Sequence, residues 1–220
     1  METTTDTGAT TRALLACGAL AGPVYVITAL AQGLTRQGFD LLRHDVSLLA
    51  NGPMGWIQTA NFLLTGALVV ACAVGVRRAA GAGRRATWGS VLVGVYGLGV
   101  LGGGVFPADP VSGFPPGTPG GVPATVSVPG TLHVVSAGLG FLALVAACFV
   151  LARGPAAPGG RGWAVCSRLC GVLFLAGFGA GISAPTSPAG VLALWAAVVI
   201  GWAWLLVLAV RTLRTERTPA

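Results

Sequence analysis

The sequence has no lysine, and only 9% of its 220 residues are charged. Water-soluble domains carry about 25% charged residues, so this scarcity excludes a soluble globular protein. Hydrophobic residues make up 54% of the chain instead, and the mean hydropathy is +0.81. The net charge of +7 comes from arginines in short clusters beside long apolar runs, not from one basic surface. Lipid is therefore the expected solvent, and nucleic acid is not an expected partner.

Motifs for cofactors and covalent catalysis are also missing. The chain has no Walker motif, no GxSxG elbow and no dinucleotide fingerprint, and its many glycines lie largely inside apolar runs. Its five cysteines lie within or at the edges of these runs, and an odd number without pairs in the loops argues against a disulfide framework. The two histidines, His44 and His133, could bind a metal with an aspartate or hold a haem, but no diagnostic ligand spacing accompanies them. We therefore predict neither a metal nor a cofactor.

Six apolar runs are long enough to cross a membrane as helices. Because hydrocarbon offers no hydrogen-bond partners to the backbone, a spanning helix needs about 20 mainly apolar residues. The first run is too long for the apolar core of a cleaved signal peptide, which has about 7–15 residues. The sequence therefore predicts an all-α bundle of six transmembrane helices, at residues 13–33, 56–76, 88–106, 131–152, 164–184 and 190–210.

Arginine positions predict the orientation of this bundle, because arginine-rich loops stay in the cytoplasm during insertion. Only Arg36 and Arg43 lie on the side of the 1–2 connection. The set on the opposite, cytoplasmic side comprises Arg77, Arg78, Arg84, Arg85, Arg153, Arg161, Arg211, Arg214 and Arg217. We predict a multi-pass protein of a bacterial plasma membrane, with both ends in the cytoplasm. Its single domain covers residues 13–210, between cytoplasmic tails at residues 1–12 and 211–220.

Small residues at helical spacing indicate close packing of these helices. GxxxG pairs occur in the first, third and fifth runs, at Gly18/Gly22, Gly99/Gly103 and Gly177/Gly181. In lipid, such glycines let two helix backbones approach closely enough to gain dispersion energy. The Gly-rich faces could close the bundle itself or form a homo- or hetero-oligomer, and a high overall glycine content explains them equally well.

The segment between the first two helices carries polar residues at helical spacing. Arg36, Asp40 and His44 recur every four residues. We expect an outer interfacial amphipathic helix here, with these residues on one face and an apolar stripe on the other. Arg36 and Asp40, and likewise Asp40 and His44, would then be neighbours on that face, and local ion pairing alone would explain their charges.

Acidic and histidine side chains gather near the outer boundary of the predicted membrane. Asp109 follows the third helix and His133 lies in the first turn of the fourth, so that these two side chains can meet. Ionisable groups beside hydrocarbon are costly unless paired, so a pocket that joined them would be a functional candidate. The candidate catalytic residues are Asp40, Asp45, Asp109 and His133, and His44 is a candidate binding residue. The alternatives are a turn role for Asp109 and a capping or interfacial role for His133.

Several segments together resemble a known family. The segments are GVFPADP at residues 104–110 with His133 after it, DVSLLA at 45–50, GPMGW at 52–56 and LLTGAL at 63–68. In these the chain resembles the bacterial membrane proteins grouped as domain of unknown function 998, over residues 13–210. The resemblance implies a six-helix layout without an assigned activity, so it carries no catalytic residue over. It does suggest that Asp109 and His133 are more than loop residues.

Three classes of function remain. The first, which requires the fewest unobserved contacts, is a small bundle that binds a membrane lipid or a partner protein. The second is an intramembrane enzyme that acts at the outer leaflet on a lipid-like or isoprenoid small molecule through the outer aspartates and histidine. A transporter is disfavoured because the spans contain almost no ionisable residues. Gln58 and Asn61 could line the same pocket as binding residues, although hydrogen bonding between helices is the more common use of such amides.

Overall fold

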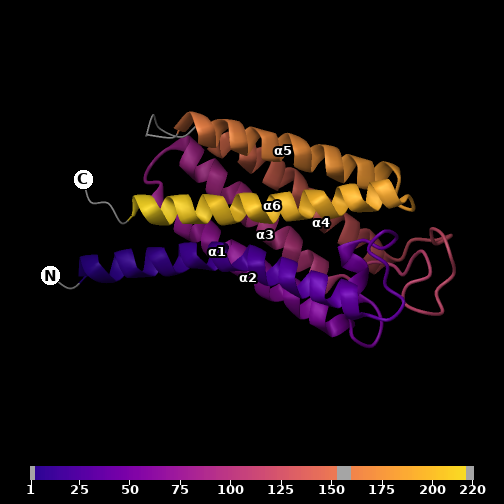
Figure 1. Ribbon diagram of the computed structural model, residues 1–220. Coiled ribbons are helices and arrows are strands. Elements are labelled where there is room, and N and C mark those ends of the chain that lie inside the picture. The colour runs from indigo at the N-terminus through magenta and orange to yellow at the C-terminus, as the bar shows by residue number, and fades with distance from the viewer. Residues whose placement is uncertain (1–2, 153–159, 217–220) are drawn as a thin grey trace.

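The computed structural model describes residues 3–152 and 160–216. Within these residues the fold is all-α, as predicted, and contains no strand. Figure 1 shows six long helices arranged as one bundle. They are α1 (Thr3–Thr35), α2 (Gly55–Ala79), α3 (Arg84–Val105), α4 (Val128–Leu151), α5 (Gly160–Ser183) and α6 (Pro188–Thr215), and a short 3-10 helix, η1 (Val46–Ala50), precedes α2.

All six helices are long and apolar enough to cross a membrane. Even the shortest, α3, has 22 residues, and at 1.5 Å per residue it spans about 33 Å, slightly more than a hydrocarbon core of about 30 Å. α1 begins at Thr3, well before the predicted start of the first span, and α6 continues to Thr215. The predicted spans are therefore correct in number and position. Every helix begins before its predicted span, whereas α3, α4 and α5 each end one residue before the predicted end.

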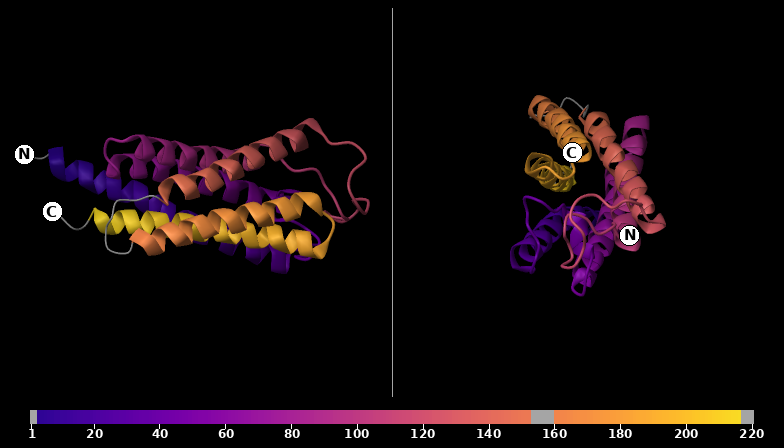
Figure 2. Two further views of the ribbon diagram at one scale, coloured as in Figure 1. Left: turned by 90° about the horizontal axis from the view of Figure 1, so that it is seen from above. Right: turned by 90° about the vertical axis from the view of Figure 1, so that its right-hand side faces the viewer.

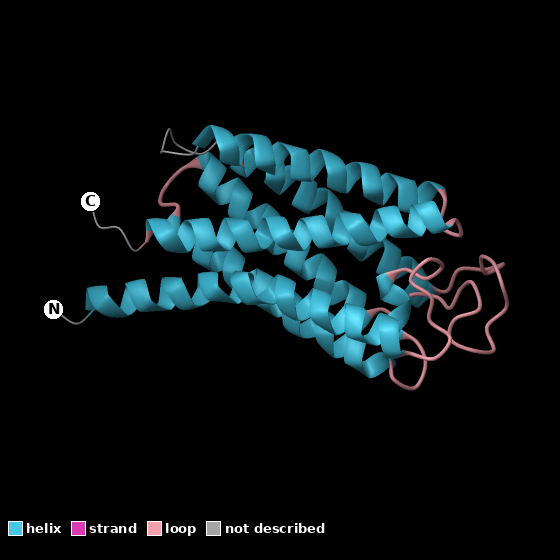
Figure 3. Ribbon diagram, viewed as in Figure 1, coloured by secondary structure: helices cyan, strands magenta, loops and turns pink. Residues whose placement is uncertain are grey.

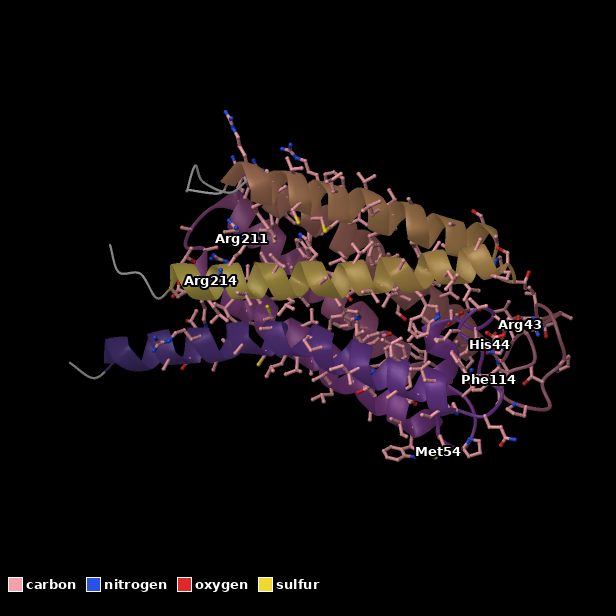
Figure 4. The ribbon with its side chains drawn as sticks, viewed as in Figure 1. Arg43, His44, Met54, Phe114, Arg211 and Arg214 are labelled. Carbon is pink, nitrogen blue, oxygen red and sulfur yellow. The ribbon has the colours of Figure 1, made fainter. Side chains whose placement is uncertain are left out.

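The bundle has two chemically different ends. Both termini and the α2–α3 connection lie at one end, which we call the terminal end (Figure 1). The α1–α2, α3–α4 and α5–α6 connections lie at the other, the loop end, which carries the longest loops (Figure 3). Arg211 and Arg214 lie at the terminal end, and Arg43 lies at the loop end (Figure 4). Arg153 and Arg217, which the orientation prediction also used, lie outside the described residues.

Close approach of backbones joins the first four helices. A Cβ on Gly99 of α3 would lie 2.7 Å from the Cα of Gly140 on α4, and a Cβ on Gly97 would lie 3.0 Å from the carbonyl oxygen of Gly66 on α2. The predicted glycine pairs also face neighbours within this chain: Gly18 faces Cys72, Gly22 faces Trp202, and Gly177 faces Ala193. These contacts hold one chain together, and the oligomer stays a prediction.

At the terminal end, hydrogen bonds hold α4, α5 and α6 together. The indole of Trp163 donates to the Leu151 carbonyl at 2.9 Å, and the hydroxyl of Ser167 donates to the Cys148 carbonyl at 2.7 Å. The indole of Trp204 on α6 donates to the same hydroxyl oxygen at 2.8 Å. Buried polar groups need such partners in a membrane, and these bonds tie α5 to both of its neighbours.

Toward the loop end, α4 and α5 diverge (Figure 2). Phe141 on α4 contacts Phe174 and Phe178 on α5, with ring centroids 5.2 and 5.1 Å apart. Phe141 and Phe178 also line the cavity described below.

The prediction of an amphipathic helix between α1 and α2 is wrong. Residues 36–45 form turns, followed by η1, and Gly38 has a φ of +79°, which interrupts a right-handed helix. The guanidinium of Arg36 donates to the carbonyl oxygens of Leu49 and Asn51 instead of pairing with Asp40. Arg36 therefore uses its charge to bind backbone carbonyl groups of the loop. In a helix most of those carbonyls would accept from the helix's own backbone N–H groups.

The α1–α2 and α3–α4 loops pack on each other at the loop end. Phe114, from the α3–α4 loop, is buried and its ring lies 5.4 Å from that of His44 and 5.1 Å from that of Phe39. The guanidinium carbon of Arg36 lies 5.2 Å from the centre of the Phe114 ring. Figure 4 shows His44 and Phe114 together at this end. We call residues 36–54 and 107–127, joined in this way, the loop-end cap.

Candidate functional site

A cavity of about 270 Å³ lies beneath the loop-end cap, inside the bundle. Side chains from η1 and all six helices line it, and most of them are apolar. Phe62, Phe141, Val198 and Trp202 form much of its wall. Small-molecule sites in proteins are mostly apolar with a few polar groups, and this cavity has that composition.

The cavity opens sideways, between α4 and α5. Two lining residues have largely exposed side chains: Val134 on α4 is 65% exposed and Ile182 on α5 is 61% exposed. Val134 is near the start of α4 and Ile182 is near the end of α5, and it is toward these loop-end parts that the two helices diverge (Figure 2). Both positions belong to helices that are long and apolar enough to cross a membrane, so an opening there would face lipid.

Asp45 supplies the one carboxylate of the cavity wall. It is half-buried and forms the N-cap of η1, where its Oδ1 accepts from the Ser47 backbone N–H at 2.9 Å and also from the Ser47 hydroxyl. Capping uses one oxygen of the carboxylate. The structure records no hydrogen bond to the other oxygen among the described residues, so it can accept from a ligand.

His133, in the first turns of α4, is 7% exposed and lines the same cavity. Its Nδ1 lies 2.8 Å from the carbonyl oxygen of Phe106. A carbonyl oxygen only accepts hydrogen bonds, so Nδ1 carries the hydrogen of this bond and the neutral ring has its lone pair on Nε2. No hydrogen bond to Nε2 is present in the described part of the chain. His133 therefore presents a second acceptor.

His44 has the opposite arrangement and no free nitrogen. Its Nδ1 accepts from the Asp40 backbone N–H at 2.9 Å, and its Nε2 lies 3.1 Å from the Ser112 carbonyl oxygen, to which it donates. Its own carbonyl accepts from the indole of Trp195 on α6 at 3.0 Å. His44 thus joins two loops and a helix, and neither ring nitrogen is available for a ligand.

The two rings are expected to be opposite tautomers when both are neutral. Nitrogen NMR of histidine-labelled protein distinguishes a protonated from an unprotonated ring nitrogen, and the chain has only these two histidines. A His133→Asn variant removes one set of signals and so assigns both, while its amide N–H can replace Nδ1–H at Phe106. Protonation of the same nitrogen in both rings would show that one of these hydrogen bonds is wrongly assigned.

The other two predicted carboxylates lie away from the cavity. Asp40 is exposed, and its Oδ1 accepts from the Leu42 backbone N–H at 2.9 Å within a turn. Asp109 accepts from the Ser127 backbone N–H at 2.9 Å and lies against Gly130, at the start of α4. Asp109 and His133 share one end of α4 but bond to different groups. Of the predicted catalytic residues, the structure brings only Asp45 and His133 to one cavity.

Gln58 and Asn61 form a buried amide cluster behind the cavity. The Gln58 Oε1 accepts from the Gln32 amide on α1 at 2.9 Å and from the Asn61 amide at 3.2 Å. The Asn61 amide also donates to the Tyr25 carbonyl at 3.1 Å. These bonds tie α1 to α2, which matches the common use of amides between membrane helices. Neither residue lines the cavity, so the binding role proposed for them from the sequence has no support in this geometry.

A known protein family matches the part of the chain that forms this cavity. The model of the family described as Protein of unknown function (DUF998) matches residues 19–211, which include α2 to α5, most of α6 and the second half of α1. The chain belongs to the DUF998 family. Neither a curated protein nor a solved structure matches it. This DUF998 protein is a multi-pass integral membrane protein, and its activity has to be inferred from its own cavity.

Sequence analysis of this DUF998 protein missed part of the cavity wall. Tyr25 and Tyr96 both line it, as do Ser47 and Trp202. The two tyrosines are the only ones in the sequence and both lie inside apolar runs. A polar hydroxyl at that depth needs a partner, so their position was a signal that a search confined to ionisable residues did not use.

Proposed function

We propose that this DUF998 protein binds a membrane lipid, whose apolar chain enters the cavity between α4 and α5. The observation that supports this is the lateral opening of an apolar cavity, marked by the exposed lining residues Val134 and Ile182. A water-soluble ligand would need an opening toward the loops, where the loop-end cap lies. A lipid chain reaches the opening by diffusion within the leaflet.

The dimensions favour one chain over a whole phospholipid. A volume of about 270 Å³ is close to the lower end of the roughly 300–1,000 Å³ that small-molecule sites occupy. A two-chain phospholipid is much larger than this space. One chain can enter while the rest of the molecule stays in the bilayer, because the opening faces lipid.

The polar end of such a lipid would lie near Asp45, at the level of the loop-end cap. The arginine distribution supports an orientation in which this end faces outward, since Arg77, Arg78, Arg211 and Arg214 belong to the opposite end. The ligand would then come from the outer leaflet of the plasma membrane. An acid/base role for Asp45 and His133 stays a prediction, because no reacting bond is placed between them.

A Gly138→Phe substitution is expected to block this binding. Gly138 lines the cavity beside Val134, and a Cβ there would meet no atom within 4 Å, so the larger side chain fits without disturbing the backbone. The protein in nanodiscs is exposed to two photoactivatable alkyl probes that share one diazirine-bearing chain and end in an alcohol or a phosphate. Labelling is then mapped by mass spectrometry to Val198 and Trp202, which are 5% and 2% exposed. Bulk lipid does not reach these wall residues.

We expect at least one probe to label the wall, and Gly138→Phe to reduce that labelling by about tenfold or more, equivalent to about 1.4 kcal/mol of binding free energy. Gly179→Phe is the matched control, because Gly179 also meets nothing within 4 Å but does not line the cavity. Wall residues that neither probe labels, or equal loss in both variants, would overturn the proposed function.

A further inference from the structure

We infer that the cavity selects lipids whose polar group donates hydrogen bonds and carries no negative charge, namely long-chain alcohols or amines, and rejects lipid phosphates. This rests on the proposed function, because it concerns the polar end of the lipid whose chain occupies the cavity. The selectivity follows from the polar atoms of the wall, whereas lipid binding follows from its apolar surface, so the two can be tested separately.

Two polar atoms left available at the wall are acceptors. The second carboxylate oxygen of Asp45 has no hydrogen-bond partner among the described residues, and neither has Nε2 of His133, whose hydrogen is on Nδ1. Two acceptors on one cavity are complemented by a group with O–H or N–H donors. A phosphate monoester at neutral pH offers mainly acceptor oxygens, which would face these two groups without a bond.

The charge of the wall favours the same ligands. Asp45 is the sole carboxylate among the lining residues, and none of them is an arginine. Of the two loop-end arginines, Arg36 donates to the Leu49 and Asn51 carbonyls and stacks on Phe114, and Arg43 is exposed on the cap. Phosphate sites in proteins use arginine, lysine or helix N-termini. Here a phosphate would meet a carboxylate in a low-dielectric site, where like charges repel strongly.

The tyrosine hydroxyls do not reverse this preference. Tyr25 and Tyr96 line the cavity and are both buried. A neutral hydroxyl can donate one hydrogen bond to a phosphate, but it supplies no positive charge to offset that of Asp45. Alcohols and amines satisfy the acceptors without this repulsion, and an amine would in addition neutralise Asp45.

The test is a competition for the wall residues in nanodiscs. The alcohol probe is displaced by unlabelled compounds of one chain length that end in an alcohol, a primary amine or a monophosphate. We expect the alcohol, the amine or both to compete at concentrations at least about tenfold lower than the phosphate, a difference of about 1.4 kcal/mol. The order of alcohol and amine then shows whether hydrogen bonding or charge pairing with Asp45 dominates.

An Asp45→Asn variant tests the cause of the preference. Its amide oxygen still accepts from the Ser47 N–H, so the cap of η1 is kept while the charge is removed. We expect the phosphate to approach the alcohol in affinity in this variant. Asp109→Asn is the control, because it likewise keeps its acceptor for the Ser127 N–H but lies outside the cavity wall, and it should retain the wild-type preference.

The outcomes separate the two proposals. Wall labelling by the phosphate probe that equals or exceeds labelling by the alcohol probe, with both lost in Gly138→Phe, would overturn the selectivity and leave lipid binding intact. An unchanged preference in Asp45→Asn would overturn the electrostatic cause assigned here. Absence of labelling by either probe would overturn the proposed function itself.

Discussion

Gly99→Ala is expected to lower the free energy of unfolding by about 2–3 kcal/mol, the upper part of the range for overpacking in a protein core. The new Cβ would lie 2.7 Å from both the Cα of Gly140 and the carbonyl oxygen of Ser136. Both are backbone atoms of α4, so no side-chain rotation can relieve the contact. The two helices would have to separate, which would weaken the dispersion contacts along the whole crossing. In lipid no hydrophobic force compensates for this loss.

Gly94→Ala on the same helix is the matched control. A Cβ at Gly94 would meet only the Cβ of Ala73, at an ordinary 3.7 Å, and alanine has the higher helix propensity. We expect this variant to be as stable as the wild type or slightly more stable. The stability of both variants is measured by heating the purified proteins in detergent and determining the folded fraction by size-exclusion chromatography. Equal stability of the two variants would contradict the close crossing of α3 and α4.

The six spans could be predicted from the sequence because the membrane imposes a strong constraint. The span predicted at residues 56–76 corresponds to Gly55–Ala79, and that at 190–210 corresponds to Pro188–Thr215. Any segment that crosses hydrocarbon must satisfy its own backbone, so length and apolarity suffice to find it. Length and apolarity locate the helix ends less well, because outside hydrocarbon that constraint no longer decides the conformation.

The segment between α1 and α2 could not be predicted in the same way. Its conformation depends on partners far away in the sequence: His44 bonds to Ser112 in the α3–α4 loop, and Trp195 of α6 bonds to the His44 carbonyl. Local spacing contains no information about these contacts. The i,i+4 pattern from Arg36 to His44 predicted a helix because helices are the common cause of that spacing, and here tertiary hydrogen bonds replaced it.

The candidate site was predicted in part for a similar reason. Outer polar residues could be recognised from their position beside apolar runs, and two of them, Asp45 and His133, do line one cavity. Which of the outer polar residues line the cavity depends on where α4 and α5 diverge. That position depends on side-chain packing, such as that of Phe141 against Phe178. Asp109 appeared equivalent to Asp45 in the sequence, yet it accepts from the backbone N–H of Ser127, the N-cap of α4, and lies against Gly130.

Arg36→Met is expected to open the loop-end cap. It removes the donors to the Leu49 and Asn51 carbonyls and the cation beside the Phe114 ring. Partial burial lowers the pKa of Arg36, but an arginine remains charged at neutral pH. Hydrogen bonds to charged groups contribute about 1.5–3 kcal/mol each. Because Arg36 is only half-buried and solvent weakens both bonds, we expect a loss of about 2–4 kcal/mol in local stability. Hydrogen exchange in residues 36–54 and 107–127 should accelerate accordingly, with little change in the middle of the helices.

Two further variants show whether geometry or charge is responsible. Arg36→Lys keeps the charge but presents a single ammonium in place of a planar fork, so it should restore only part of the protection. Arg43→Met is the control, because Arg43 is exposed on the same cap and should leave exchange unchanged. Since η1 carries Asp45 and is held by the Arg36 bond to Leu49, an opened cap would also displace the carboxylate from the cavity. Arg36→Met should therefore reduce the preference for alcohols over phosphates, whereas Arg43→Met should not. Equal rates of hydrogen exchange in the two variants would show that Arg36 does not hold the cap.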